Sequence, residues 1–180
     1  MYAWEQLRTD LEAGAKALVA SYSGRLYKFA YRLCSDSAMS EDLTIRTLAR
    51  AVKAEGEFKS EPAYFSFLCA ILVNLRRDDL RLKAANALVF MDEIPDVEDS
   101  RPDPLEALAA KSDAEAVRMA VSRLSPVLRE TVVMRYFADL PVAGIAEALA
   151  VPEGTVKFRL SEGRRRIREF LSQRNVGIAR

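Results

Sequence analysis

The most chemically distinctive side chains lie near the end of the sequence, in AVPEGTVKFRLSEGRRRIREF at residues 150–170. Lysine and arginine side chains can neutralise phosphates, which positions a protein on a nucleic acid without specifying a sequence. Side chains at the start of a helix can enter a major groove and contact base edges. An arginine run is weak evidence by itself, since most charge runs are solvated helix faces. The elements around this stretch must therefore decide between the two interpretations.

Groups that carry out catalysis are sparse elsewhere. The sequence has no histidine and two cysteines, Cys34 and Cys69. Histidine is the commonest general base, and zinc needs about four nitrogen, sulfur or oxygen ligands. Both cysteines stand in apolar helical patterns, YRLC and FSFLC, which favour buried thiols over a disulfide or a redox role. We therefore expect no enzyme, no metal and no cofactor, although an enzyme that uses carboxylates alone stays open.

The sequence also predicts where the protein works. No apolar run approaches the roughly 18–20 residues that cross a bilayer. The start, MYAWEQLRTDLEAG, has acidic residues where a signal peptide has a continuous apolar core. We expect a cytoplasmic protein that does not insert into membranes.

The formal net charge of +1 hides an uneven distribution of charge. Residues 84–116 carry nine acidic and two basic side chains, whereas residues 117–180 carry twelve basic and six acidic ones. The acidic segment MDEIPDVEDSRPDPLEA contains three prolines and few apolar residues that could form a core. Such a composition favours an extended connector. We predict two small domains, at residues 1–83 and 112–180, joined by an acidic flexible linker at residues 84–111.

Apolar residues at helical spacing run through the first domain. A stripe begins at Trp4, and it continues after an interruption at the Ser-Gly pair of residues 23–24. Ser40 is suited to cap a helix that ends near Ala54, and Pro62 suits the first turn of another helix. No convincing period-2 strand appears, so the sequence predicts an all-α fold. The stripe residues, expected in the core, are Trp4, Leu7, Leu11, Ala15, Leu18, Tyr22, Leu26, Phe29, Ala30, Leu33, Phe65, Leu68, Leu72 and Leu75.

The second domain is also predicted to be helical. Ser125 and Pro126 signal a helix start, because Ser caps a helix and Pro fits its first position. A short helix at VAGIAEALA and a longer one from TVKFRL are joined by the turn VPEG, which makes a helix-turn-helix. Gly163 inside the last helix costs about 1 kcal/mol relative to Ala, which either a close approach to a neighbouring helix or a tolerated defect explains. One apolar stripe of this helix, Val156, Leu160, Gly163, Ile167, Phe170 and Leu171, should pack on Ile145, Ala146 and Leu149.

Two long stretches resemble one known family. LSPVLRETVVMRYFADLPVAGIAEALAVPEGTVKFRLSEGRRRIREFL resembles the fourth conserved domain of bacterial sigma factors of the extracytoplasmic-function (ECF) type. In the first half, LYKFAYRL, SEDLTIRTLARAV and FSFLCAILVNLRRDDLRLK resemble the second sigma domain, in the family's order. The resemblance implies a transcription initiation factor, associated with stress responses, that binds core RNA polymerase and directs it to promoter DNA. It also implies an anti-sigma factor as a partner, and no chemistry of the chain's own.

The resemblance implies that the last helix recognises the −35 promoter element. Lys157, Arg159 and Arg165 suit phosphates, whereas Phe158 suits a thymine methyl group. Phe158 stands where the family commonly has Ser, and Glu162 where it commonly has Arg, so we expect an altered −35 preference. Glu162 either accepts from a cytosine amino group or pairs with an arginine three or four residues further on. The implied −35 residues are Thr155, Lys157, Phe158, Arg159, Ser161, Glu162, Arg165 and Arg166.

The resemblance assigns recognition of the −10 element to the first domain. GEFKSEPAYF, at residues 56–65, corresponds to the loop that captures an unstacked −10 base, which Phe58 or Tyr64 would help to stack. Anchoring of this loop to the core is an equally good explanation of both aromatic residues. The basic end of the domain suits −10 DNA, with plain solvation as the alternative. The implied −10 residues are Phe58, Tyr64, Asn74, Arg76, Arg77, Arg81 and Lys83.

The helix after Ser40 resembles the helix that docks on the polymerase clamp. Ile45 and Arg46 stand where Gln-Glu is usual in the family, and Val52 stands where Trp is frequent. These departures slightly favour an alternative, a sigma-like mimic that binds an anti-sigma factor without initiating transcription. An ordinary helix-turn-helix regulator is a weaker alternative, because it would not need the first domain. The implied polymerase-binding residues are Glu41, Asp42, Leu43, Arg46, Arg50 and Lys53.

Overall fold

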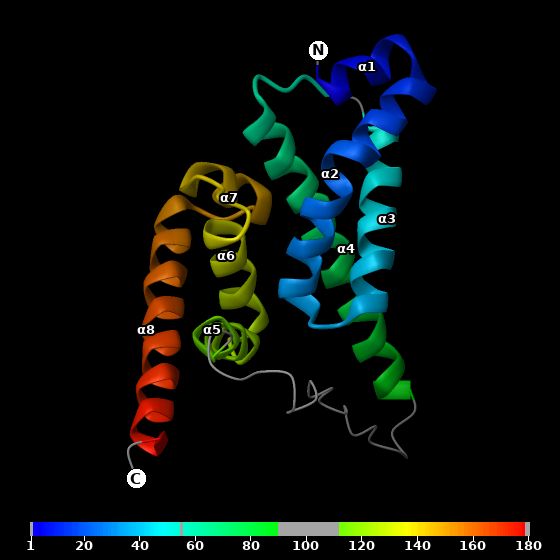
Figure 1. The fold of residues 1–180 in the computed structure, drawn as a ribbon. Coiled ribbons are helices and arrows are strands. Elements are labelled where there is room, and N and C mark those ends of the chain that lie inside the picture. The colour runs from blue at the N-terminus through cyan, green and yellow to red at the C-terminus, as the bar shows by residue number, and fades with distance from the viewer. Residues whose placement is uncertain (1, 55, 90–111, 179–180) are drawn as a thin grey trace.

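The computed structural model describes residues 2–54, 56–89 and 112–178. Every regular element within these ranges is an α-helix, as the sequence predicts. Four helices of the first half pack together, and four helices of the second half lie beside them (Figure 1). The helices are α1 (Ala3–Thr9), α2 (Leu11–Cys34), α3 (Ser37–Lys53), α4 (Glu61–Val89), α5 (Ser112–Ser122), α6 (Pro126–Tyr136), α7 (Val142–Leu149) and α8 (Glu153–Ile178).

The first predicted stripe is broken by a turn at Asp10, whose extended backbone ends α1. The Asp10 carboxylate accepts hydrogen bonds of 3.0 Å from two backbone N–H groups in the first turn of α2 and so caps that helix. Gly14 lets α1 fold back on α2, because a Cβ at this position would lie 2.6 Å from Leu7 Cα. The turn shifts the helical phase. Leu11 is therefore 61% exposed, and the prediction that it joins the core is wrong.

Two predicted helix boundaries differ from the structure. The Ser-Gly pair of residues 23–24 does not interrupt α2, because the glycine faces open space and the buried stripe of the helix continues on both sides. That burial outweighs the cost of about 1 kcal/mol for a glycine inside a helix. The next helix, α3, begins at Ser37 rather than near Ser40. Asp36 provides the cap, since its Oδ1 accepts from a backbone N–H in the first turn at 2.7 Å.

The core of the first domain lies between α2, α3 and α4. Cys69 of α4 is fully buried in it and Cys34 of α2 is partly buried, and both are free thiols. Burial raises the pKa of both thiols above the ordinary value. The remaining core residues that carry most of the apolar burial are Leu18, Leu26, Phe29, Leu33, Leu43, Phe65, Leu68, Leu72 and Leu75.

The second domain packs α8 against α5, α6 and α7. Pro126 occupies the first position of α6 as predicted, whereas the Ser125 side chain makes no capping hydrogen bond. The turn into α8 passes through Ala150, whose φ of 52° is left-handed. Gly163 marks the close approach that the sequence allows for: a Cβ there would lie 2.6 Å from Cγ2 of buried Val132 on α6.

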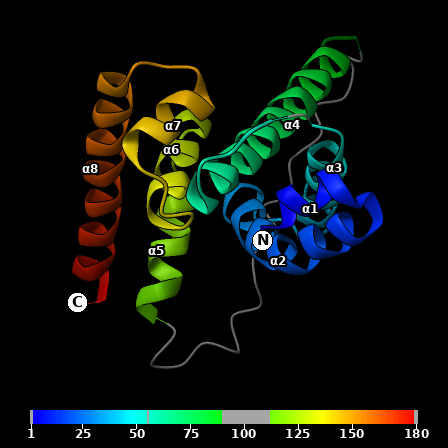
Figure 2. The ribbon, with the colours of Figure 1, turned by 90° about the horizontal axis from the view of Figure 1, so that it is seen from above.

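The two domains pack against each other through α2 and α4 on one side and α5, α6 and α7 on the other (Figures 1 and 2). Arg129 Nη1 of α6 donates to the Leu33 carbonyl at the end of α2, at 3.0 Å. The Arg32 guanidinium lies 4.4 Å from the centre of the Phe137 ring. We call this arrangement the closed state. α4 continues to Val89, past residue 84 where the linker is predicted to begin, and the rest of that linker lies outside the described residues.

Gly163→Ala tests the contact that seats α8. Because Val132 is buried and β-branched, it cannot swing away cheaply, and we expect a loss of about 1–3 kcal/mol in the free energy of unfolding. Gly24→Ala is the matched control, since its Cβ would meet nothing within 4 Å. That variant should gain about 0.5–1 kcal/mol from helix propensity. Urea unfolding measures both. Equal changes in the two variants would show that the α6–α8 approach is not constrained.

Candidate nucleic-acid interface

The helix α8 is anchored by its apolar stripe and presents its other face to solvent. Val156 is fully buried and Leu160 is 7% exposed, and both side chains belong to the hydrophobic core. On the outward face, Phe158 is 70% exposed, an unusual setting for a large aromatic ring. Lys157 and Ser161 beside it are also exposed. The sequence-predicted −35 residues thus share a solvent-facing surface near the start of α8, with Thr155 and Arg159 half-buried at its margin.

Glu162 is bound by two arginines one turn further along α8. Its Oε2 accepts from Arg165 Nε at 2.8 Å, and its Oε1 accepts from Arg165 Nη2 at 2.6 Å and from Arg166 Nε at 2.8 Å. Arg165 also pairs with Glu169, at 2.5 Å. The hydrogen bonds from Arg165 and Arg166 lower the pKa of Glu162 to about 2. In the unbound chain Glu162 therefore forms ion pairs with arginines of its own helix, which is one of the two roles expected for it.

Sequence reasoning missed two cations on the same helix. Arg164 and Arg168 are exposed, and they follow Lys157 and Ser161 at spacings of three and four residues. These four side chains therefore share one face of α8. The signal was present in the sequence, because the same spacing applied from Lys157 onward includes both arginines.

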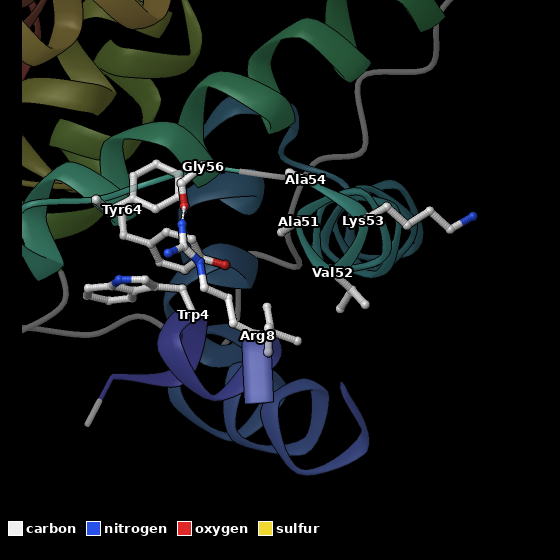
Figure 3. Close-up of a pocket in the computed structure, with 10 residues that line it drawn as sticks. Trp4, Arg8, Ala51, Val52, Lys53, Ala54, Gly56 and Tyr64 are labelled. Atoms are coloured by element: carbon white, nitrogen blue, oxygen red, sulfur yellow. Dashed lines mark hydrogen bonds between the residues drawn. The ribbon is translucent and has the colours of Figure 1, made fainter. Parts of the chain in front are cut away.

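An aromatic pocket lies in the first domain, beside the loop between α3 and α4. This cavity of 490 Å³ is lined by residues of α1, the end of α3 and the loop, together with Tyr64 of α4. Figure 3 shows the Trp4 and Tyr64 rings at the pocket, with Arg8 reaching the backbone of Gly56. Arg8 Nη2 donates to the Gly56 carbonyl at 2.8 Å and so ties α1 to the loop.

The two aromatic residues predicted to stack a base differ in accessibility. Tyr64 is 1% exposed, and its hydroxyl has no hydrogen-bond partner among the described residues. Phe58 is half-buried on the loop, and its ring centre lies 4.7 Å from that of Tyr64 in an edge-on contact. Trp4, 4.7 Å from Tyr64, completes the cluster. The sequence assigned Trp4 only to the core, because nothing local indicates that α1 folds back against this loop.

The basic end of α4 is divided between solvent and the domain interface. Asn74, Arg81 and Lys83 are exposed. Arg77 is 29% exposed and Arg76 only 8%, because both donate to a carboxylate of α6. In the closed state the predicted −10 residues are therefore not presented as one surface.

The predicted polymerase-docking residues also separate into two groups. Glu41, Asp42, Arg50 and Lys53 are exposed along α3. Leu43, by contrast, is fully buried in the core and can act only by holding the helix in place. Arg46 is bound by Asp79 of α4 through two hydrogen bonds, of 2.9 and 3.0 Å, and by Asp42 at 2.8 Å. These bonds fasten α3 to α4, and they raise the pKa of the Arg46 guanidinium.

Within the described parts of the chain, no three His, Cys, Asp or Glu side chains come together as a metal site would require. None of the helices in the same ranges is both long and apolar enough to cross a bilayer.

The pairing of Glu162 predicts its titration. Its folded-state pKa, about 2, lies below the ordinary 4.5, so the ion pairs stabilise the folded chain at neutral pH and are lost as the pH falls from 4.5 through 2. Removing both donors in Arg165→Gln/Arg166→Gln should return the pKa towards 4.5. Arg168→Gln removes a charge from the same helix without either hydrogen bond and should leave the pKa low. NMR titration of the carboxyl group measures all three. A wild-type midpoint near 4.5 would contradict the pairing.

Comparison with known proteins identifies both halves of the chain. The family profile described as Sigma-70 region 2 matches residues 18–85, and the profile of Sigma-70, region 4 matches residues 114–167. These matches cover α3, α6 and α7 and most of α2, α4, α5 and α8, whereas α1 lies outside them.

Individual relatives agree with the two profiles. The ECF RNA polymerase sigma factor BldN of Streptomyces coelicolor is 29% identical over 78% of this chain, which spans only 53% of BldN. The ECF RNA polymerase sigma factor SigL of Mycobacterium tuberculosis is 30% identical over 92% of both chains. Among solved structures, the sigma factor RpoE in complex with the anti-sigma factor NepR, from Bartonella quintana, has a TM-score of 0.69. The RpoE chain is 23% identical to this chain, and the match covers 86% of this chain and 94% of RpoE. This likeness supports the fold. The chain belongs to the ECF sigma factors of RNA polymerase.

Proposed function

We propose that this chain binds core RNA polymerase and directs it to promoters by recognising −35 and −10 elements. The observation that carries the proposal is the outward face of α8. An exposed aromatic ring, Phe158, stands there beside Lys157 at the start of a helix that a helix-turn-helix presents to solvent. This is the geometry in which side chains reach base edges in a major groove. We infer that the protein works in the cytoplasm, where it meets polymerase and DNA.

At the −35 element, cations position the helix and Phe158 contributes specificity. Lys157, Arg159 and Arg165 neutralise phosphates, and the exposed Arg164 and Arg168 extend the same basic surface. Phe158 contacts a thymine methyl group, because an apolar ring favours that group in the major groove. Thr155 and Ser161 complete the surface. Glu162 orients Arg165 and Arg166 rather than reading a base, since both of its oxygens already accept hydrogen bonds.

At the −10 element, the aromatic pocket receives an unstacked base. The half-buried Phe58 stacks on it, while the buried Tyr64 and Trp4 form the apolar wall behind. The exposed Asn74, Arg81 and Lys83 contact the sugar–phosphate backbone of the DNA beside that base. Arg76 and Arg77 join them after the domains separate.

The exposed side of α3 binds the polymerase, and its contact residues are Glu41, Asp42, Arg50 and Lys53. Leu43 and Arg46 support this helix from below, one in the core and one through Asp79. We also propose an anti-sigma factor as a partner, as RpoE has in its complex with NepR.

A second candidate is a sigma-like mimic that binds an anti-sigma factor without initiating transcription. Two features of α3 favour it: Ile45 is 67% exposed on the docking side, and Arg46 is held by carboxylates of its own chain. Run-off transcription with core polymerase and a random promoter library separates the candidates. The proposed function predicts promoter-dependent transcripts from a shared −35 motif. A properly folded protein that yields no promoter-dependent transcript supports the mimic.

The −35 assignments predict two different mutant phenotypes. Lys157→Ala should weaken binding to all selected promoters alike and reduce the slope of log K against log salt by about one. Phe158→Ala should lose discrimination at one base pair, where a mismatch typically costs about 1–3 kcal/mol, and leave the salt slope unchanged. Fluorescence anisotropy on selected and point-substituted −35 duplexes measures both. Uniform weakening by Phe158→Ala would contradict base readout by this ring.

Trp4 reports on the aromatic pocket, because it is the one tryptophan in the sequence and lines the cavity. Single-stranded −10 DNA from the selected promoters should quench its fluorescence. Phe58→Ala should weaken that binding by about 1–3 kcal/mol, the usual worth of one base stacked on an aromatic ring. Tyr31→Ala removes an exposed ring of α2 outside the pocket and serves as the control. Equal affinity in the two variants would assign Phe58 to loop anchoring alone.

A further inference from the structure

A buried charge cluster lies where the two domains meet. Glu130 of α6 accepts from Arg77 Nη2 at 2.7 Å and Nε at 3.1 Å, and from Arg76 Nη1 at 3.4 Å. The Glu130 side chain is only 3% exposed. Arg129, the preceding residue of α6, is also partly buried and lies within electrostatic range of Arg76. The cluster thus combines three guanidiniums with one carboxylate.

Glu130 occupies the groups that the proposed function assigns to −10 DNA. A carboxylate and a phosphate offer a guanidinium the same kind of paired oxygen acceptors. Arg77 cannot direct Nε and Nη2 at Glu130 and at a phosphate at once. The outward face of α8 is exposed to solvent in the same state. The closed state therefore withholds part of the −10 surface and leaves the −35 surface open.

We propose that Glu130 is an autoinhibitory contact, which holds the domains closed and keeps Arg76 and Arg77 from DNA until the chain opens. The DNA side of this inference rests on the proposed function, whereas the closing role of Glu130 does not. Removing one partner of a buried ion pair leaves the other charge uncompensated. Without the Glu130 charge, three like charges meet at the interface, and separating the domains returns them to water.

Glu130→Gln keeps the shape of the side chain and removes its charge. We expect the full-length variant to have a larger radius of gyration by X-ray scattering. It should bind a labelled single-stranded DNA of mixed sequence about tenfold more tightly, as when the open fraction rises from about one in ten to nearly all. Glu147→Gln is the matched control, because it removes the same charge from an exposed position on α7. It should stay compact and change the affinity by less than about twofold.

An engineered disulfide between the domains, called the lock below, tests the same inference by holding the chain closed until the bond is reduced. A Cβ at Gly144 of α7 would lie 3.1 Å from Ser66 Oγ of α4, the atom that a cysteine sulfur would replace, so cysteines at the two positions are close enough to be joined. Oxidised Ser66→Cys/Gly144→Cys should bind the same DNA about threefold or more weakly than its reduced form. Dithiothreitol should restore binding. Wild type treated in parallel controls for Cys34 and Cys69.

The outcomes separate cleanly. Expansion with tighter binding in Glu130→Gln, and reversible loss in the lock, support the inference. It is overturned if Glu130→Gln matches Glu147→Gln in size and affinity, or if it expands without gaining affinity. Should Glu130→Gln unfold, the lock decides: equal binding by its two forms, or no cross-link in the folded variant, overturns the inference. Run-off transcription by the wild type is a separate measurement. If it yields no transcripts, the proposed function is contradicted, whereas the radius of gyration still tests the closing role of Glu130.

Discussion

The arrangement of this molecule depends on one buried carboxylate. Glu130 is shielded from water between the domains, where an unpaired charge would be costly, so Arg76 and Arg77 must stay within hydrogen-bond reach of it. This requirement joins α4 to α6, in addition to the packing of α4 on α7 and of α2 on α5 and α6. The contact is polar and specific, it lies beside apolar packing that joins the cores of the two domains, and a phosphate can replace the carboxylate. The interaction that closes the chain is therefore one that nucleic acid can compete for.

The position of the outward face of α8 follows from apolar packing within the second domain. Gly163 allows α8 to approach Val132, and the buried Val156 and Leu160 fix the rotation of the helix. With that rotation set, Phe158 has to point outward. The unusual residues of the helix, Phe158 and Glu162, are thus placed by ordinary packing. An altered promoter preference requires no change in the fold.

The sequence predicted what depends on local periodicity and capping, and it failed where distant segments meet. The helical stripes, the Pro126 start and the exposed face of α8 all followed from spacing along the chain. Leu11 was misplaced because an aspartate turn resets the helical phase, and Trp4 was undervalued because its partners are some sixty residues away in the sequence. The pairing of Arg76 and Arg77 with Glu130 has no local signal at all. Basic residues that suit DNA also suit a carboxylate brought close by tertiary folding.

The distance between the two domains, measured on single molecules, tests the account most directly. Dyes can be attached to cysteines introduced at the exposed Ala20 and Ala143, with Cys34 replaced by alanine. The free chain should show mainly high energy-transfer efficiency, since α2 and α7 belong to domains held in contact. Binding to core polymerase and promoter DNA should lower that efficiency as the domains separate to reach the −10 and −35 elements. An efficiency that stays unchanged in a transcribing complex would contradict the account, because the closed state would then be the working one.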